Sequence, residues 1–173
     1  MKFTAAFVAV TALVAGVTAD YAKLKSDVEG IKTDVAKLYT DLKDTDGTSY
    51  SQALAIDSAA KALNSDIENA NREAKAVKTV SNSQAKAIIH ILSGTYKDVS
   101  LVSKRLIALE PSWKKLGIAA IAKGDISSIA ASTKTFGATL VSKAPKHEKK
   151  AASELAGKYN KALAAALAAY SSD

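Results

Sequence analysis

The sequence contains no cysteine, two histidines, two prolines and few aromatic residues, which make up 6% of its 173 residues. Without cysteine there is neither a disulfide nor a thiol nucleophile, so stability must come from packing. His90 and His147 lie far apart in the sequence and have no other metal ligands near them, so we expect no zinc site. We interpret His90, between Ile89 and Ile91, as a packed or partly exposed helix residue.

Sequence patterns of common enzyme classes are also missing. There is no Gly-x-Ser-x-Gly nucleophile elbow and no glycine-rich phosphate loop after a strand. Acidic pairs such as Asp27/Glu29 and Asp66/Glu68 are spaced by two residues, so their members do not face each other on a helix. We therefore expect a protein that is not an enzyme and that uses no metal or cofactor.

Residues 1–19 have the parts of a signal peptide. Met1 and Lys2 form a short positive region, an almost purely apolar run follows from Phe3 to Val17, and Thr18-Ala19 complete a small-residue cleavage site. A membrane span needs roughly 20 apolar residues, and Asp20 ends the run too early for an uncleaved anchor. We predict a secreted, extracellular protein with a signal peptide at 1–19, one domain at 20–173 and no transmembrane segment.

Attachment and glycosylation signals are scarce in the predicted domain. No asparagine is followed by Ser or Thr two positions later, so any sugar would be O-linked. The last four residues, Tyr170 to Asp173, are not the hydrophobic tail of a lipid-anchor signal. We expect free secretion or non-covalent association with a cell wall.

Charge is distributed unevenly along the chain. Residues 20–78 carry a net charge of −2, whereas residues 79–173 carry +8. A basic half favours anionic headgroups or acidic polysaccharide as partners. Nucleic acid is not expected, because no aromatic-interleaved basic strand or zinc motif accompanies the lysines. The run from Lys143 to Lys150 is interpreted as a solvated helix start.

Apolar residues recur at helical spacing along most of the domain. Spacings of three and four place a first set on one stripe of an amphipathic helix, which the turn residues Asp44 to Gly47 end. A second stripe follows in a helix from about Ser49 to Lys78. The two stripes are Leu24, Val28, Ile31, Val35, Leu38 and Leu42, then Ile56, Ala60, Leu63, Ile67, Ala70, Ala74 and Val77.

The second half of the chain predicts shorter helices. Ser81 or Asn82 can cap a third helix, in which we expect a kink or short break near Gly94 and an interruption at Glu110-Pro111. Residues 112–123 then form a short helix that ends at Gly124, Asp125 caps a fifth, and Pro145 starts the last. Strand signals are essentially absent, so we predict an all-α, up-and-down bundle of five or six amphipathic helices.

The order of these features resembles the fungal hydrophobic-surface-binding protein and cell-wall galactomannoprotein family. The resemblance rests on the signal peptide, the heptad-like first helix, the alanine-rich second helix and the clusters Leu106-Ile107-Ala108-Leu109, Lys114-Lys115, Gly117, Phe136-Gly137 and Lys143-Ala144-Pro145. It implies a secreted or wall-associated helical domain that binds lipids in an apolar cavity or adsorbs to hydrophobic surfaces. Some members recruit hydrolases to those surfaces.

Two binding hypotheses follow for this chain. In the first, the bundle encloses a lipid such as a fatty acid, or its stripes lie on an apolar surface. In the second, a structural or helper protein docks a partner, such as a secreted hydrolase, through an exposed stripe. Residues from the inward stripes of the predicted third to fifth helices are the candidate pocket wall: Ile88, Leu92, Leu106, Trp113, Ile121, Phe136 and Leu140.

Such a pocket would also need polar groups at its edge. Trp113 either borders the pocket or an interface, or simply caps the core. The carboxylate of a fatty acid would reach solvent or meet a polar side chain, for which Tyr96 and Lys115 are candidates.

Overall fold

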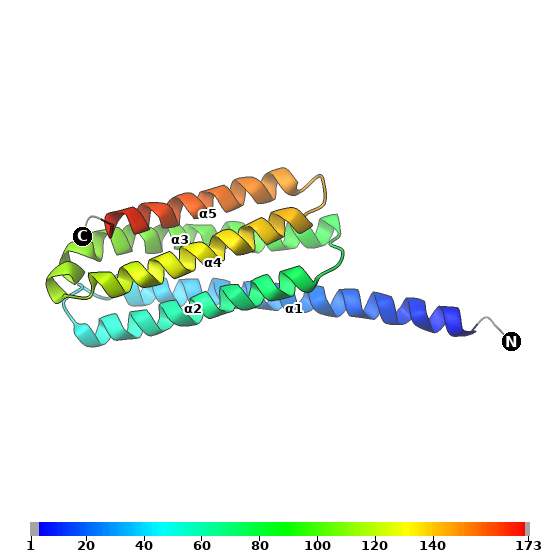
Figure 1. The fold of residues 1–173 in the computed structure, drawn as a ribbon, viewed down its shortest axis with the longest axis horizontal. Helices are drawn as coiled ribbons and strands as arrows, with labels where there is room; N and C mark the ends of the chain where they lie inside the picture. The colour runs from blue at the N-terminus through cyan, green and yellow to red at the C-terminus, as the bar shows by residue number, and fades with distance from the viewer. Residues whose placement is uncertain (1–3, 172–173) are drawn as a thin grey trace.

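The computed structural model describes residues 4–171, with side chains from residue 20 onward. Five helices make up the fold: α1 (Thr4–Lys43), α2 (Tyr50–Ala76), α3 (Asn82–Leu116), α4 (Ala119–Lys143) and α5 (Lys149–Ala169). No strand occurs between residues 4 and 171. Successive helices run in opposite directions along the long axis of the molecule (Figure 1). The predicted all-α bundle is therefore confirmed, with five helices.

The first part of α1 extends beyond the other helices, at the end of the bundle where α3 and α5 begin (Figure 1). The signal-peptide prediction falls on residues 1–19, whose side chains lie outside the described part of the chain. Within the part that is described, no helix has the length and apolar character needed to cross a membrane.

The helices form a closed ring. α1 packs against α2 and α3, α4 packs against α2 and α5, and α5 also packs against α3. The order around the ring is thus α1, α2, α4, α5 and α3. α3 and α4 lie across the ring from each other and make little direct contact. A ring of five helices leaves a central space that side chains must fill or leave open.

The apolar stripes of α1 and α2 line this centre as the sequence predicts. All six stripe residues of α1 and all seven of the second stripe are buried. α1 ends at Lys43, directly before the predicted turn residues. In that turn Gly47 has a φ of 82°, which favours glycine. Arg105 of α3 holds the turn by donating hydrogen bonds to the carbonyls of Leu42, at 2.9 Å, and Thr45.

The predicted boundaries in the second half of the chain are wrong. α3 continues through Pro111 and ends at Gly117, whose φ of 80° and backbone N–H close the last turn. Buried Leu109 and Trp113 flank Pro111 and hold the helix against the core, which offsets the hydrogen bond that proline cannot donate. The separate short helix at 112–123 therefore does not exist. Gly124 and Asp125 both lie inside α4.

Local hydrogen bonds determine where α3 and α5 begin. Ser81 caps α3 through a reciprocal capping box with Gln84, as one of the two predicted caps. α3 runs past Gly94 without a break. Pro145 does not start α5: its carbonyl accepts hydrogen bonds from Glu148 and Lys149, and this separate turn precedes the helix.

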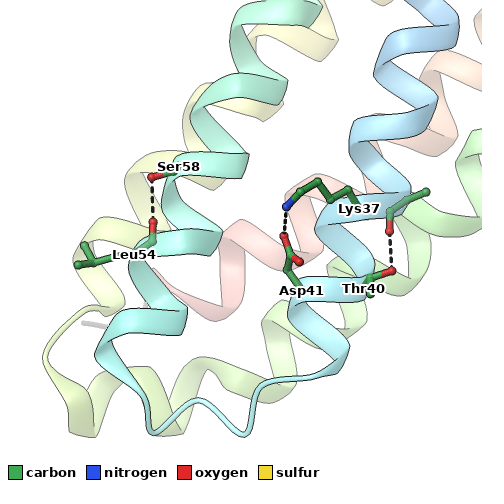
Figure 2. Close-up of polar contacts among 6 residues, drawn as sticks. Lys37, Thr40, Asp41, Leu54 and Ser58 are labelled. Atoms are coloured by element: carbon green, nitrogen blue, oxygen red, sulfur yellow. Dashed lines mark hydrogen bonds and ion pairs between the residues drawn. The ribbon is translucent and has the colours of Figure 1, made fainter.

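Exposed helix faces carry short-range polar contacts. Lys37 Nζ lies 2.7 Å from Asp41 Oδ2 on α1, and Ser58 Oγ donates to the Leu54 carbonyl at 3.0 Å on α2 (Figure 2). The Leu54 side chain points away from α1 (Figure 2). Such pairs stabilise a helix only slightly, so the buried stripes supply most of the stability.

Candidate functional site

The centre of the ring is not completely filled. A first cavity of about 100 Å³ lies in the half of the bundle that contains the start of α2 and the turn between α3 and α4. All five helices contribute to its wall, and most of the wall is apolar. Its apolar residues include Ile31, Val35, Leu63, Val99, Leu106, Ile129 and Leu163.

A second cavity of about 80 Å³ lies in the other half of the bundle, next to the α2–α3 and α4–α5 loops. It is lined by Leu24, Val80, Ile88, Leu140, Ala152 and Leu155 among others. Each cavity is several times larger than the ~10–15 Å³ that a single water needs, yet such apolar walls offer water few partners. Both spaces therefore suit apolar ligands better than water.

Four residues line both cavities and form the partition between them: Leu92, Thr133, Phe136 and Tyr159. Phe136 is buried, and the Tyr159 hydroxyl donates a hydrogen bond to the Leu92 carbonyl at 2.7 Å. The Tyr159 ring also lies 5.5 Å from the Tyr96 ring. Burial raises the pKa of Tyr159, so this hydroxyl stays protonated. These four residues come from α3, α4 and α5, so three helices contribute to the partition.

All seven candidate wall residues from the sequence line one of these cavities. Leu106, Trp113 and Ile121 line the first, Ile88 and Leu140 line the second, and Leu92 and Phe136 line both. They come from α3 and α4 rather than from three helices, because of the corrected boundaries. Contact of these residues with a ligand stays a prediction.

Sequence reasoning did not include the wall residues of α1, α2 and α5. Val35 and Leu63 lie on the two predicted stripes, Tyr159 lies on α5, and each lines a cavity. The position of a residue on an apolar stripe could therefore have identified these wall residues, because the inward stripes of all five helices face the same centre. The sequence reasoning also did not include Lys143, which lines the second cavity. The two polar candidates, Tyr96 and Lys115, are not among the lining residues of either cavity.

Trp113 lies inside the bundle, with only 3% of its surface exposed. Its ring centroid lies 6.3 Å from that of Tyr170, whose hydroxyl donates to the Leu106 carbonyl at 2.7 Å. The indole N–H has no hydrogen-bond partner in this structure. Trp113 is therefore both a core residue and part of the wall of the first cavity.

The two cavities carry opposite charge. The first is lined by Asp57 of α2 and Asp125 of α4, and Lys61 Nζ lies 2.8 Å from Asp57 Oδ1. Partial burial and the neighbouring Asp57 carboxylate raise the pKa of Asp125 to about 6. The second cavity is lined by Lys143, whose Nζ donates to the carbonyls of Val77 at 2.7 Å and Lys75 at 3.0 Å.

Exposed apolar side chains surround the opening of the first cavity. Tyr50, Leu54 and Ile121 line it while remaining 53%, 46% and 45% exposed. Among the residues whose side chains are described, the fourth large apolar residue with this degree of exposure is Ile107, which lines neither cavity. His90 is exposed on α3, and no cluster of three or more potential metal ligands occurs in the described part of the chain.

Comparison with solved structures shows the same fold in proteins crystallised with fatty acids. Afmp4p in complex with palmitic acid has a TM-score of 0.83 and 24% identity, covering 87% of this chain and 99% of that one. Ligand-binding domain 1 of the Penicillium marneffei MP1 protein, complexed with arachidonic acids, has a TM-score of 0.81 and 20% identity over 88% and 99%. Domain 2, with multiple arachidonic acids, gives 0.77 and 13% over 90% and 97%.

Comparison at the sequence level identifies the family. The chain matches no curated protein. The family model of hydrophobic surface binding protein A matches residues 21–142, a range that begins within α1, includes α2 and α3, and ends one residue before the end of α4. This chain therefore belongs to the hydrophobic surface binding protein A family.

Proposed function

We propose that this protein binds a long-chain lipid such as a fatty acid inside the helical ring, without catalytic turnover. The observation that carries the proposal is the pair of apolar cavities that share four wall residues, among them Leu92 and Phe136. Rotation of the Phe136 or Leu92 side chain would join them into one elongated space along the bundle. An acyl chain needs a space of this shape and polarity.

Relatives with the same fold support this proposal. Afmp4p is described in complex with palmitic acid, and both ligand-binding domains of the MP1 protein with arachidonic acids. Their identity to this chain is 24% or less, so the ligand itself is inferred from the cavities. Family membership is consistent with binding to apolar surfaces as well as to single lipids.

The free energy available from the cavity walls is sufficient. Each buried methylene contributes about 0.8 kcal/mol, so a chain with about 14 enclosed methylenes contributes about 11 kcal/mol. Association costs at least about 4 kcal/mol in lost freedom of motion. The difference corresponds to roughly micromolar binding, and it requires that most of the chain is enclosed.

Native mass spectrometry of protein purified from its own host tests the proposal. We expect a co-purifying long-chain lipid whose mass and structure are unchanged after prolonged incubation with the protein. In titrations with hexadecanoic acid, Leu92→Trp should weaken binding at least tenfold, because the indole fills the space on both sides of the partition. Phe136→Ala should keep or strengthen binding, since it removes part of the partition.

Ile107→Trp is the matched control, because it places the same indole on an exposed position of α3 outside both cavities. It should bind within twofold of wild type. Equal, weak binding by all four proteins, with no lipid in the purified sample, would contradict an enclosed site. A partner protein in the purified sample instead of a lipid would favour the docking hypothesis.

The apolar rim of the first cavity supports a second activity, adsorption to hydrophobic surfaces. Tyr50, Leu54 and Ile121 expose apolar area around one opening of the first cavity. A hydrophobic surface that contacts this rim would therefore lie next to the cavity. Leu54→Ser should reduce retention on hydrophobic beads, whereas Ile107→Ser, a similarly exposed position elsewhere, should not. Equal loss from both variants would show that adsorption does not depend on the rim.

We further propose that residues 1–19 are removed during secretion. The short positive start and the apolar run from Phe3 to Val17 support this proposal. The mature protein should then begin at Asp20, which intact-mass measurement of the secreted protein would detect. Cell-wall association would appear as release of the same species from walls by detergent or salt.

A further inference from the structure

We propose that a bound long-chain acid has one fixed direction in the ring, with its carboxylate beside Lys143 in the second cavity and its methyl end in the first cavity. This inference rests on the proposed lipid binding and adds the residue that orients the ligand. It concerns a single ammonium group, the partition at Phe136 and the two carboxyl groups at the other end.

The distribution of charge along the cavities sets the direction. Among the described residues that line either cavity, Lys143 is the only cation, and Asp57 and Asp125 are the only acids. The cation lines one cavity and both acids line the other. A carboxylate placed in the first cavity would lie near two acidic residues, whereas in the second it would lie near the one lysine of the wall.

Lys143 is held in position for this role. Its ammonium donates to the carbonyls of Val77 and Lys75, at 2.7 Å and 3.0 Å, at the end of α2. An ammonium has three N–H donors, so these two bonds fix the group and leave one donor for a ligand oxygen. The Tyr21 hydroxyl, which donates to the Gln84 carbonyl at 3.4 Å, lines the same cavity. A preorganised donor loses little side-chain entropy when it binds.

The first cavity is less suited to a carboxylate. Lys61 is paired with Asp57 at 2.8 Å and also lies near Asp125, so its charge is directed to these two acids, and it does not line the cavity. The remaining polar side chains of the wall are Tyr50, Thr133, Tyr159 and Trp113, and the Trp113 indole N–H is an uncharged donor without a hydrogen-bond partner. The Tyr159 hydroxyl already donates to the Leu92 carbonyl. This end therefore has walls for a hydrocarbon chain and no cation for its headgroup.

The spacing along α4 brings the chain into both cavities. Phe136 precedes Lys143 by two helical turns, or about 10 Å along the axis, and Asp125 lies about 27 Å from Lys143. A long acyl chain anchored at Lys143 must therefore pass Phe136 and continue into the first cavity. The methyl end then lies toward the apolar rim formed by Tyr50, Leu54 and Ile121.

The test compares two ligands that share one chain and differ in headgroup, hexadecanoic acid and hexadecan-1-ol. Lys143→Met should weaken binding of the acid at least tenfold at pH 8 and leave binding of the alcohol within twofold of wild type. Lys143→Arg should restore binding of the acid. Lys146→Met is the matched control, because this exposed lysine lines neither cavity, and it should change neither affinity.

Because Lys143 also caps α2, Lys143→Gln provides a second variant that keeps an N–H donor for the Val77 carbonyl without the charge. It should show the same selective loss of the acid. Equal loss of acid and alcohol in both variants, or no loss of the acid in either, would overturn the assignment of Lys143. If wild-type protein binds neither ligand, the proposed lipid binding itself fails, which is a different outcome.

Discussion

At the scale of single residues, Gly47 shows how tightly the turn after α1 is packed. Its φ of 82° is unfavourable for other residues, and an added Cβ would lie 2.9 Å from both Leu109 Cδ2 and Ser112 Cβ. Trp113, a wall residue of the first cavity, is the next nearest neighbour at 3.3 Å, so this glycine lets the turn pack closely against α3.

We expect Gly47→Ala to destabilise the protein by about 2–4 kcal/mol, from left-handed backbone strain together with overpacking. Gly94→Ala is the control, since it lies within a helix with no neighbouring atom within 4 Å of its added Cβ. That variant should gain about 0.5–1 kcal/mol. Urea denaturation measures both free energies of unfolding, and equal effects would contradict the described packing of the turn.

Asp125 gives the protein a pH-dependent stability. Its pKa rises to about 6 in the folded chain from 3.8 when unperturbed, mainly through burial and then through Asp57. The folded state therefore keeps a proton that the unfolded chain releases between these values. The contribution of this group to stability is fully present below about pH 4 and is lost as the pH rises through 6.

Asp125→Asn removes the ionisation while keeping a donor that faces Asp57. We expect this variant to have a higher Tm than wild type at pH 7.5, and the difference should shrink toward pH 4. Asp41→Asn, which removes the exposed pair with Lys37, should show no such gain at pH 7.5. A Tm difference for Asp125→Asn that is the same at both pH values would contradict the raised pKa.

At the scale of helices, Pro111 is a position where the local sequence predicts a helix end but the structure has a continuous helix. A proline inside a helix costs about 3 kcal/mol relative to alanine, yet α3 continues through it to Leu116. The apolar face around Leu109 and Trp113 is buried on both sides of it. Tertiary packing thus outweighs a strong local helix breaker.

We expect Pro111→Ala to raise the free energy of unfolding by about 1–3 kcal/mol, because it adds the missing N–H donor and removes the ring from the helix. Calorimetry and urea denaturation would detect such a gain. A neutral or destabilising result would mean that the helix is shaped around the proline ring.

Helix prediction succeeded where the apolar period was regular. The stripes of α1 and α2 consist of residues three and four apart without proline, and all of them are buried as predicted. Boundaries failed at Pro111, Gly124 and Pro145, where a local signal competes with burial that cannot be read from neighbouring residues. Gly117, with its positive φ, is the actual end of α3.

At the scale of the whole molecule, the sequence identifies which residues face inward but not whether they fill the centre. The seven candidate wall residues of α3 and α4 all line a cavity, yet the same periodicity would occur in a solid core. The central gap accompanies a five-membered ring, in which non-neighbouring helices make little or no direct contact. Ring order is a property of tertiary contacts, which periodicity within one helix does not encode.

Lys143 illustrates a second limit. The sequence places it in a basic run that is typical of a solvated helix start, and Lys146, Lys149 and Lys150 of that run are indeed exposed. Lysine combines an apolar stem with a charged end, so its stem can line a cavity while its ammonium reaches a carbonyl. The tertiary structure identifies the lysine that combines both features: Lys143 of α4, whose ammonium donates to the Val77 carbonyl at the end of α2.

In the proposed complex, one acyl chain occupies both cavities and passes the partition at Phe136. A crystal structure of the protein with 16-bromohexadecanoic acid tests it most directly, because anomalous scattering from bromine locates the methyl end of the chain. We predict one bromine in the first cavity, between Phe136 and Asp125, and continuous ligand density that ends beside Lys143. Bromine found only on the outer surface, at the rim of Leu54 and Ile121, would contradict the enclosed site.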